Sequence, residues 1–188
     1  MKIRLALLAA LLALSACKRA APTAADSFPV KETAAGVPMI DFDSPEAGFS
    51  CRAPRDWGVR PEKYLAASKG AAFTGPGGNI TILKYPESEP GRTDAKSYAE
   101  TFWLVDPKGK QPEITEETVA GAKILRFHLE RAAMIPHSKT MLPPERYDYA
   151  LVPVKGGFFE IQHRAPAGEY QKTLPVFEAV VRSFKPKS

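Results

Sequence analysis

The side chains best suited to chemistry in this chain are two cysteines and three histidines. His128, His137 and His163 are scattered along the sequence, whereas zinc sites commonly use His and Cys ligands at close spacings. The sequence contains no HExxH and no CxxC motif, and a site made of three histidines would require folding to gather all of them. We therefore expect no metal, no cofactor and no catalytic residue. The two cysteines, Cys17 and Cys51, lie in different kinds of sequence and have different expected roles.

The first 16 residues have the pattern of an export signal. Lys2 and Arg4 form a basic start, and an apolar run of Leu and Ala follows from Leu5 to Leu14. This run is too short to cross a bilayer as a stable helix, which needs roughly 20 apolar residues. Small residues then lead to a cysteine in the segment Leu14-Ser15-Ala16-Cys17.

That segment resembles the lipobox of bacterial lipoproteins. The resemblance implies diacylglyceryl transfer to the thiol of Cys17, cleavage after Ala16, and acylation, for example with palmitate, of the new amino terminus. Two or three acyl chains give stable membrane attachment, whereas a single chain gives only marginal attachment. The alternatives are an ordinary secretory signal that ends in Ala-Cys and an uncleaved transmembrane anchor. Lys18, in place of an Asp that would retain the protein in the inner membrane, favours the periplasmic face of the outer membrane in a Gram-negative host.

Composition divides the rest of the chain into a tether and one domain. Residues 17–37 comprise the lipidated cysteine and a segment rich in Ala, Pro and Thr without apolar periodicity, which predicts a flexible tether that reaches about 25 Å. Residues 38–188 have the length of a single domain. The net charge of +5 comes from interspersed charges, so neither the composition nor the expected export favours nucleic acid as a partner.

Alternation and helical spacing predict the elements of this domain. Phe49, Cys51 and Ala53 share one phase of a strand, which places Cys51 on the core face as a small hydrophobic side chain. His163 is in phase with Phe159 and is interpreted as a packing histidine at the edge of the core. We expect strands at residues 39–43, 48–53, 71–74, 79–85, 113–119, 123–131, 147–154 and 158–164, a helix capped by Thr93 and closed by Pro107, and a helix over 168–184 that Pro175 kinks or restarts.

Strands in hairpins with two amphipathic helices predict an α+β fold, an antiparallel sheet with helices packed on it. The segment Gly48–Trp57 resembles the opening of the PsbP/Mog1-like fold, in which a strand runs into a Pro-x-x-Trp turn. The final helix, ending Val180-Val-Arg-Ser-Phe184, completes the likeness, which covers roughly residues 37–186. The resemblance implies an αβα sandwich with Trp57 as a corner plug and Phe184 in the core. It also implies a binding or assembly module, because members of this fold are mostly of that kind.

One loop has an unusual composition for a surface segment. Residues 132–144 contain apolar side chains where loops are usually polar, and Met-rich mobile surfaces suit adaptable binding. The alternative is that these side chains fold back over the core. The candidate partner-binding residues are Met134, Ile135, His137, Met141 and Leu142.

Three functional hypotheses follow from the sequence. The leading hypothesis is a membrane-anchored envelope lipoprotein that acts as a non-enzymatic binding module, with the membrane and an envelope protein as partners. The second is a carrier of a small apolar ligand or lipid, which predicts a sizeable apolar cavity between sheet and helix. The third is a hydrolase, which predicts that one histidine meets a carboxylate or Cys51 in a cleft.

Overall fold

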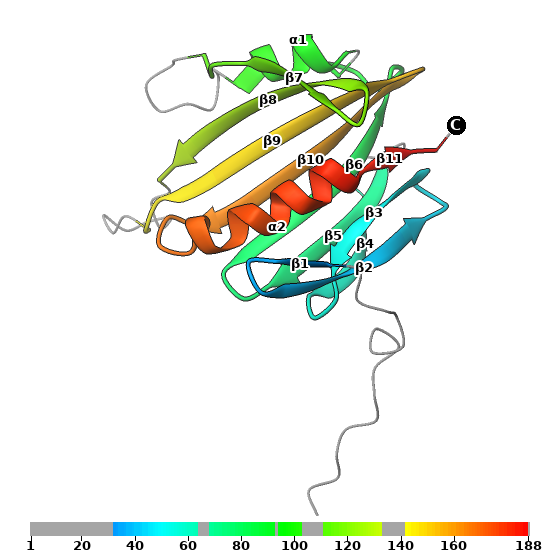
Figure 1. Cartoon of the computed structure of the whole chain (residues 1–188). Coiled ribbons are helices and arrows are strands. Elements are labelled where there is room, and N and C mark those ends of the chain that lie inside the picture. The colour runs from blue at the N-terminus through cyan, green and yellow to red at the C-terminus, as the bar shows by residue number, and fades with distance from the viewer. Residues whose placement is uncertain (1–31, 64–67, 93, 103–110, 133–141, 188) are drawn as a thin grey trace, which may run out of the picture.

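Two antiparallel sheets and two helices form the part of the chain that the computed structural model describes, residues 32–63, 68–92, 94–102, 111–132 and 142–187 (Figure 1). The larger sheet has seven strands in the order β4-β5-β6-β10-β9-β8-β7, and the smaller sheet has four in the order β1-β2-β3-β11. The strands are β1 Glu32–Ala34, β2 Val37–Ser44, β3 Phe49–Pro54, β4 Gly58–Glu62, β5 Lys69–Gly75, β6 Gly78–Pro86, β7 Thr115–Val119, β8 Ala122–Arg131, β9 Glu145–Val154, β10 Gly157–Pro166 and β11 Lys185–Pro186. The helices are α1 Ala95–Glu100 and α2 Tyr170–Ser183.

The central strand β10 divides the large sheet into two faces. Successive side chains of a strand point to opposite faces, so Phe159 and Ile161 lie on one side of β10 and Phe158 and Glu160 on the other. Phe159 and Ile161 belong to a core cluster with α2, whereas Phe158 belongs to a second cluster with α1. The sheet is therefore covered on both faces, by different elements.

The α2 face is tightly packed with aromatic side chains. The ring of Phe49 from β3 lies 5.9 Å from that of Phe159 on β10 and 5.5 Å from that of Phe184. The backbone N–H of Arg52 on β3 donates a hydrogen bond to Ser183 Oγ at 2.9 Å, which joins the small sheet to the end of α2. Figure 1 shows α2 lying across the large sheet beside the smaller one. The helix continues through Pro175 without a restart.

The other face carries the short helix α1. Asp94 caps this helix because its carboxylate accepts hydrogen bonds from the backbone N–H of Ser97, at 2.9 Å, and from the Ser97 hydroxyl, at 2.7 Å. Tyr98 and Ala99 then face the sheet and are buried. The expected cap Thr93 lies outside the described residues. The described helix ends at Glu100, earlier than the apolar spacing predicted.

The predicted α+β fold with an antiparallel sheet and helices on it is confirmed, with one addition. A second sheet shares the α2 face, and its strand β1 begins at Glu32, inside the segment expected to be part of the tether. Strands β1, β4 and β11 were not predicted, because they are short or lack apolar alternation; β4 has exposed positions from Gly58 to Pro61. No helix among the described residues is long and apolar enough to span a membrane.

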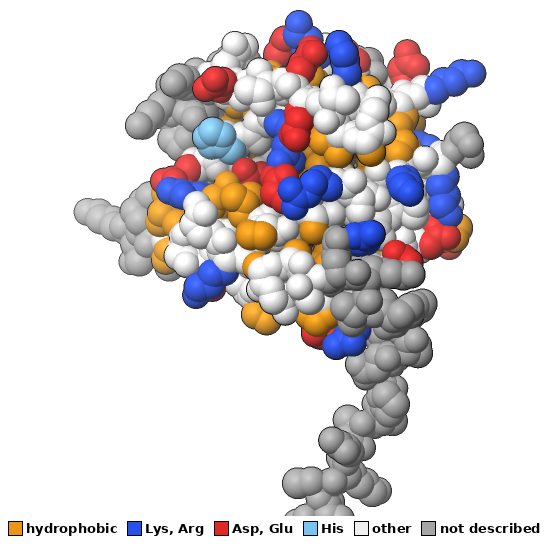
Figure 2. Space-filling model, in the orientation of Figure 1, with side chains coloured by type: hydrophobic (Ala, Val, Ile, Leu, Met, Phe, Trp, Pro, Cys, Tyr) orange, Lys and Arg blue, Asp and Glu red, His pale blue; other side chains and the backbone are white. Residues whose placement is uncertain are grey.

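Trp57 occupies the corner after β3, as the sequence predicted. Its side chain is buried in the α2-side core, and its backbone N–H donates to the carbonyl of Pro54. The indole ring packs so closely on Gly75 that a Cβ at that position would lie 2.3 Å from ring atoms. The outer surface of this side of the molecule carries interspersed charges of both signs, with hydrophobic side chains in separate small areas (Figure 2).

Candidate functional site

Most of the residues that the sequence nominated for function lie outside the described part of the chain. This applies to Cys17 and to four of the five loop candidates, Met134, Ile135, His137 and Met141. Leu142, the fifth, is 44% exposed just before β9. Their roles therefore stay predictions from sequence.

Cys51 lies in the core, as its strand phase predicted. Its side chain is 5% exposed, and burial raises the pKa of its thiol to about 12. A thiol in this environment stays protonated at physiological pH and is a poor nucleophile. Cys51 is therefore a packing residue.

His163 makes the contact with a carboxylate that the hydrolase hypothesis required. Its Nε2 lies 2.9 Å from Thr173 Oγ1, and its Nδ1 lies 3.3 Å from Asp148 Oδ2. The order hydroxyl, imidazole, carboxylate is that of a catalytic triad. His163 is completely buried, however, and Thr173 is 4% exposed on the buried side of α2, so a substrate has no access to the Thr173 hydroxyl in this structure. Together the three residues connect β9, β10 and α2.

His128 lies on the strand beside Asp148 and, unlike His163, is at the surface. It is exposed on β8, where its Cα pairs with that of Asp148 on β9. Among the described residues no group of three or more His, Cys, Asp or Glu side chains is arranged to hold a metal ion.

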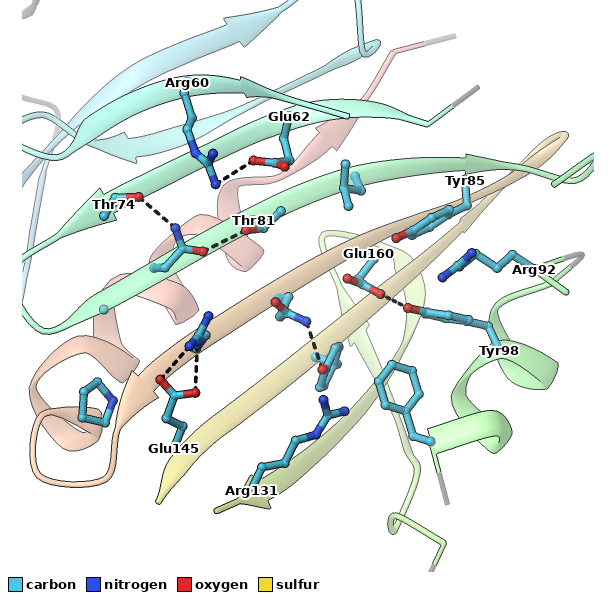
Figure 3. Close-up of a pocket in the computed structure, with 18 of the residues that line it drawn as sticks. Arg60, Glu62, Thr74, Thr81, Tyr85, Arg92, Tyr98, Arg131, Glu145 and Glu160 are labelled. Atoms are coloured by element: carbon cyan, nitrogen blue, oxygen red, sulfur yellow. Dashed lines mark hydrogen bonds and ion pairs between the residues drawn. The ribbon is translucent and has the colours of Figure 1, made fainter. Parts of the chain in front are cut away.

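A cleft of about 850 Å³ opens on the face of the large sheet opposite α2 (Figure 3). Its floor comes from β6, β9 and β10, and its sides from β4, β8 and the α1 region. Tyr98 and Arg92 enter it from the α1 side, and Arg60 and Glu62 from the β4 side. This volume lies in the range of small-molecule and cofactor sites.

The end of the cleft beneath α1 is aromatic. Phe102 packs with its ring centroid 4.8 Å from that of Tyr149 and 5.1 Å from that of Tyr98. Tyr85 lies 5.6 Å from Tyr98, centroid to centroid. These rings present both apolar surface and phenolic hydroxyls to the cleft.

A buried carboxylate lies at the base of this aromatic end. Glu160 on β10 is 4% exposed and accepts a hydrogen bond from the hydroxyl of Tyr98. Burial raises the pKa of Glu160 to about 7, and the hydrogen bond from Tyr98 and the charges of Arg92 and Arg131 offset only part of that effect. Burial and the Glu160 charge in turn raise the pKa of Tyr98.

The two arginines near Glu160 each lie over an aromatic ring. The guanidinium of Arg92 lies 4.7 Å from the ring centroid of Tyr85 and 5.3 Å from that of Tyr98. Arg131 lies 4.9 Å from the ring centroid of Tyr147. Its Nε is shielded from solvent and has no hydrogen-bond partner within the described segments.

The other end of the cleft is a hydrogen-bonded polar strip. The side-chain amide of Asn79 donates to Thr74 Oγ1 at 2.9 Å, and Gln162 Nε2 donates to the hydroxyl of Tyr149 at 2.9 Å. Arg164 donates twice to Glu145, at 2.9 and 3.0 Å. Burial alone would raise the pKa of Glu145, but the hydrogen bonds from Arg164 and Tyr147 outweigh it and lower that pKa.

This cleft was not predicted from the sequence, and the predicted binding loop at 132–144 lies mostly outside the described residues and stays a prediction. One signal was present in the alternation of β10, where Glu160, Gln162 and Arg164 share a phase in a strand between apolar neighbours. A polar stripe on one face of a central strand indicates a face that is not fully covered by core. The contributions of β4 and α1 had no such signal, because they depend on tertiary packing.

No family model and no curated protein matches the chain, but solved structures match its fold. The solution structure of CyanoP, the cyanobacterial PsbP of Synechocystis, has a TM-score of 0.51 at 12% identity, over 79% of this chain and 92% of that one. The Saccharomyces cerevisiae Ran-binding protein Mog1p has a TM-score of 0.52 at 11% identity, over 80% and 96%. A Bacteroides thetaiotaomicron protein matches with a TM-score of 0.46 at 14% identity over 79% of this chain, which spans about half (48%) of that protein. The chain thus has a PsbP/Mog1-like fold.

Proposed function

We propose that this protein is a lipid-anchored, non-enzymatic binding module of the bacterial cell envelope, which recognises an envelope protein with the sheet-face cleft. The observation that carries the proposal is the cleft itself, an open concave surface on the large sheet with aromatic side chains and arginines exposed to it. Aromatic residues and Arg are the types enriched where proteins recognise one another. The proposal includes no cofactor and no nucleic acid partner.

The anchor is the second part of the proposal. The lipobox-like segment at Leu14–Cys17 supports acylation of Cys17, and the segment that follows supports a tether between the lipid and the domain. Lys18 supports the periplasmic face of the outer membrane in a Gram-negative host. A tethered domain searches a limited volume near the membrane, which raises the effective concentration of an envelope partner.

The α2-side interior does not favour the alternative of an apolar-ligand carrier. The space between α2 and the large sheet is filled by side chains such as Phe49, Phe73 and Phe177, which are fully buried. A groove of about 1250 Å³ between α2 and the small sheet is lined in part by charged residues, Asp41, Arg52 and Arg182 among them. The cleft on the other face is lined by arginines, carboxylates and amides. A purely apolar ligand would leave those polar groups desolvated without partners, which is unfavourable.

The anchor is tested by fractionating cells that express single-cysteine variants. We expect Cys17→Ala to release the protein from the membrane fraction or to accumulate as an uncleaved precursor. Cys51→Ala is the matched control, because it removes the other thiol and should leave membrane attachment unchanged. Normal processing and attachment of Cys17→Ala would overturn the lipoprotein part of the proposal.

The binding role is tested by co-purification of the lipidated chain from detergent-solubilised envelopes. Gln162→Lys places a longer, charged side chain in the centre of the cleft floor and should abolish recovery of the partner. Lys172→Gln, on the exposed side of α2, should retain it. Equal recovery with both variants would contradict recognition through the cleft.

A further inference from the structure

Two lysines lie directly opposite each other on neighbouring strands of the large sheet. In the register of β5 and β6 the Cα of Lys69 pairs with that of Lys84, and side chains at paired positions point to the same face of a sheet. Like charges at such positions are destabilising. Neither lysine forms an ion pair with a carboxylate in the part of the chain that the structure describes. This face of the sheet therefore presents two neighbouring positive charges that an external anion would stabilise.

The ammonium group of Lys84 lies beside the turn between β2 and β3. The side chain is half-buried, and its Nζ lies 5.5 Å from the ring centroid of Phe159 on β10. A Cβ on Gly48, in that turn, would lie 3.8 Å from the same Nζ. The aliphatic part of Lys84 thus crosses apolar surface while its charge reaches the edge of the core, as long cationic side chains commonly do. The charge is therefore placed where the large and small sheets meet.

Both lysines line a hollow of about 560 Å³ at this place. Its charged lining residues are Lys69, Lys84, Lys187 and the exposed Glu46, which comes from the turn between β2 and β3. Lys187 also pairs with Asp43. Glu46 forms no ion pair with a described lysine. Three lysines against these two carboxylates leave one positive charge in excess, so the hollow attracts an anion even with both carboxylates counted.

The residue type determines which anion suits the hollow. An ammonium group is a compact point charge with three donors, whereas a planar carboxylate is matched best by the fork of an arginine. A phosphate group is tetrahedral and offers oxygens to cations that approach from different sides. Lys84 approaches from β6 and Lys69 from β5. The volume of the hollow accommodates a phosphate with a small alcohol such as glycerol attached.

We propose that this hollow binds a phosphate group between the ammonium groups of Lys84 and Lys69, and that a membrane lipid headgroup supplies the phosphate. The phosphate class rests on the hollow alone, whereas the lipid source rests on the proposed membrane anchor. Lys84 lies over Phe159, on the α2 face of the large sheet, and the cleft opens on the opposite face. Headgroups bound at the hollow therefore turn the cleft away from the bilayer and leave it open to an envelope partner.

The phosphate site is tested with a matched pair of probes, glycerol 3-phosphate and glycerol, which differ only in the phosphate. Each is titrated into the full ¹⁵N-labelled chain in dodecyl maltoside micelles, which contain no phosphate, and followed by amide shifts. We expect glycerol 3-phosphate to shift Gly48, Lys69 and Lys84, with an affinity that falls as salt is added, and glycerol to shift none of them. Equal responses to the two probes, or phosphate-dependent shifts confined to other residues, would overturn the proposal.

Single substitutions separate recognition from folding. Lys69→Gln and Lys84→Gln each remove one cation and should weaken the binding of glycerol 3-phosphate about tenfold. Glu46→Gln removes the nearby carboxylate and should strengthen it, and Lys172→Gln, on the exposed side of α2, should leave it unchanged. Lys69→Gln should also be at least as stable as the parent chain in urea, because it removes one of two like charges. If Lys84→Gln does not fold, unchanged binding in both Lys69→Gln and Glu46→Gln contradicts the proposal.

A lipid with a spin-labelled headgroup identifies the source of the phosphate. The full chain is placed in phosphatidylglycerol nanodiscs, where the label broadens amide signals close to the headgroups. Stronger broadening at Gly48 and Lys69 than at Lys172, reduced in Lys69→Gln, assigns a lipid phosphate. Equal broadening, with glycerol 3-phosphate still bound in micelles, overturns the lipid source and assigns a soluble phosphate ester. Absence of phosphate binding, with a partner still recovered through the cleft, would reject this inference and leave the proposed function intact.

Discussion

Glu160 is the residue whose environment departs most from what its type would suggest. A carboxylate on the central strand of a sheet is normally solvent-exposed or paired with a cation. Here it is buried beside Tyr98 and Tyr149, and its pKa is raised to about 7 by that burial. A buried polar group of this kind costs stability, and such groups concentrate at functional sites.

The pH dependence of stability reports directly on Glu160. Its pKa rises on folding from an ordinary 4.5 to about 7, so the folded state binds this proton more tightly than the unfolded chain does. The contribution to stability is full below pH 4.5 and is lost as the pH rises through 7. We therefore expect the free energy of unfolding of Glu160→Gln, relative to that of the parent chain, to increase by about 3 kcal/mol from pH 4.5 to pH 8. Urea unfolding at each pH measures this difference. Glu130→Gln, at a half-exposed carboxylate, is the control. If the stability of Glu160→Gln and that of the parent chain change with pH in parallel, the raised pKa of Glu160 is contradicted.

Cys51 makes a second prediction at the scale of one residue. In the Cys17→Ala chain it is the only thiol, and burial raises its pKa to about 12. We expect it to react with a disulfide reagent at pH 8 only when the domain unfolds, so that labelling is orders of magnitude faster in urea than in buffer. Complete labelling of the native chain within seconds would show that the thiol is accessible.

At the scale of elements, helices and strands with a clear apolar repeat were predictable from the sequence, and strands without such a repeat were not. Strand β8 and helix α2 have clear apolar repeats, and both form close to the expected residues. Strand β4 consists largely of exposed residues, and its place at the sheet edge depends on pairing with β5. Helix α1 had the right apolar face but the wrong cap, because Asp94 is the residue that accepts the hydrogen bonds of the first turn.

The contact between Trp57, at the corner after β3, and Gly75, at the end of β5, leads to a prediction at the scale of elements. Gly75 ends β5 directly against the indole of Trp57, with no room for a Cβ. We expect Gly75→Ala to displace Trp57 and to lower the free energy of unfolding by about 2 kcal/mol or more. Gly168→Ala is the control, because nothing lies within 4 Å of its added Cβ and its φ is not in the left-handed region; it should change stability by less than about 0.5 kcal/mol. Equal effects of the two substitutions would contradict the packing at this corner.

At the scale of the whole molecule, the fold was predictable from sequence and the site was not. Hairpins with two amphipathic helices limit the architecture to a few arrangements. The turn from Pro54 to Trp57 favoured one of these arrangements, the PsbP/Mog1-like fold that it resembles. The cleft instead joins residues from β4, β5, β6, β8, β9, β10 and the α1 region, which extend along the chain from Arg60 to Pro166. No local pattern encodes that convergence, which depends on strand order. Only the polar phase of β10 could have pointed to it.

The proposed function requires a binding face on a domain that is attached to a membrane. In-cell photo-crosslinking of the full lipidated chain tests this most directly, with the photoreactive side chain placed at Arg60 on the cleft rim or at Lys172 on α2, both exposed. The account predicts a discrete envelope protein crosslinked from position 60, lost when Gln162→Lys is added, and absent from position 172. The same crosslinked species from both positions, or none from position 60, would contradict it.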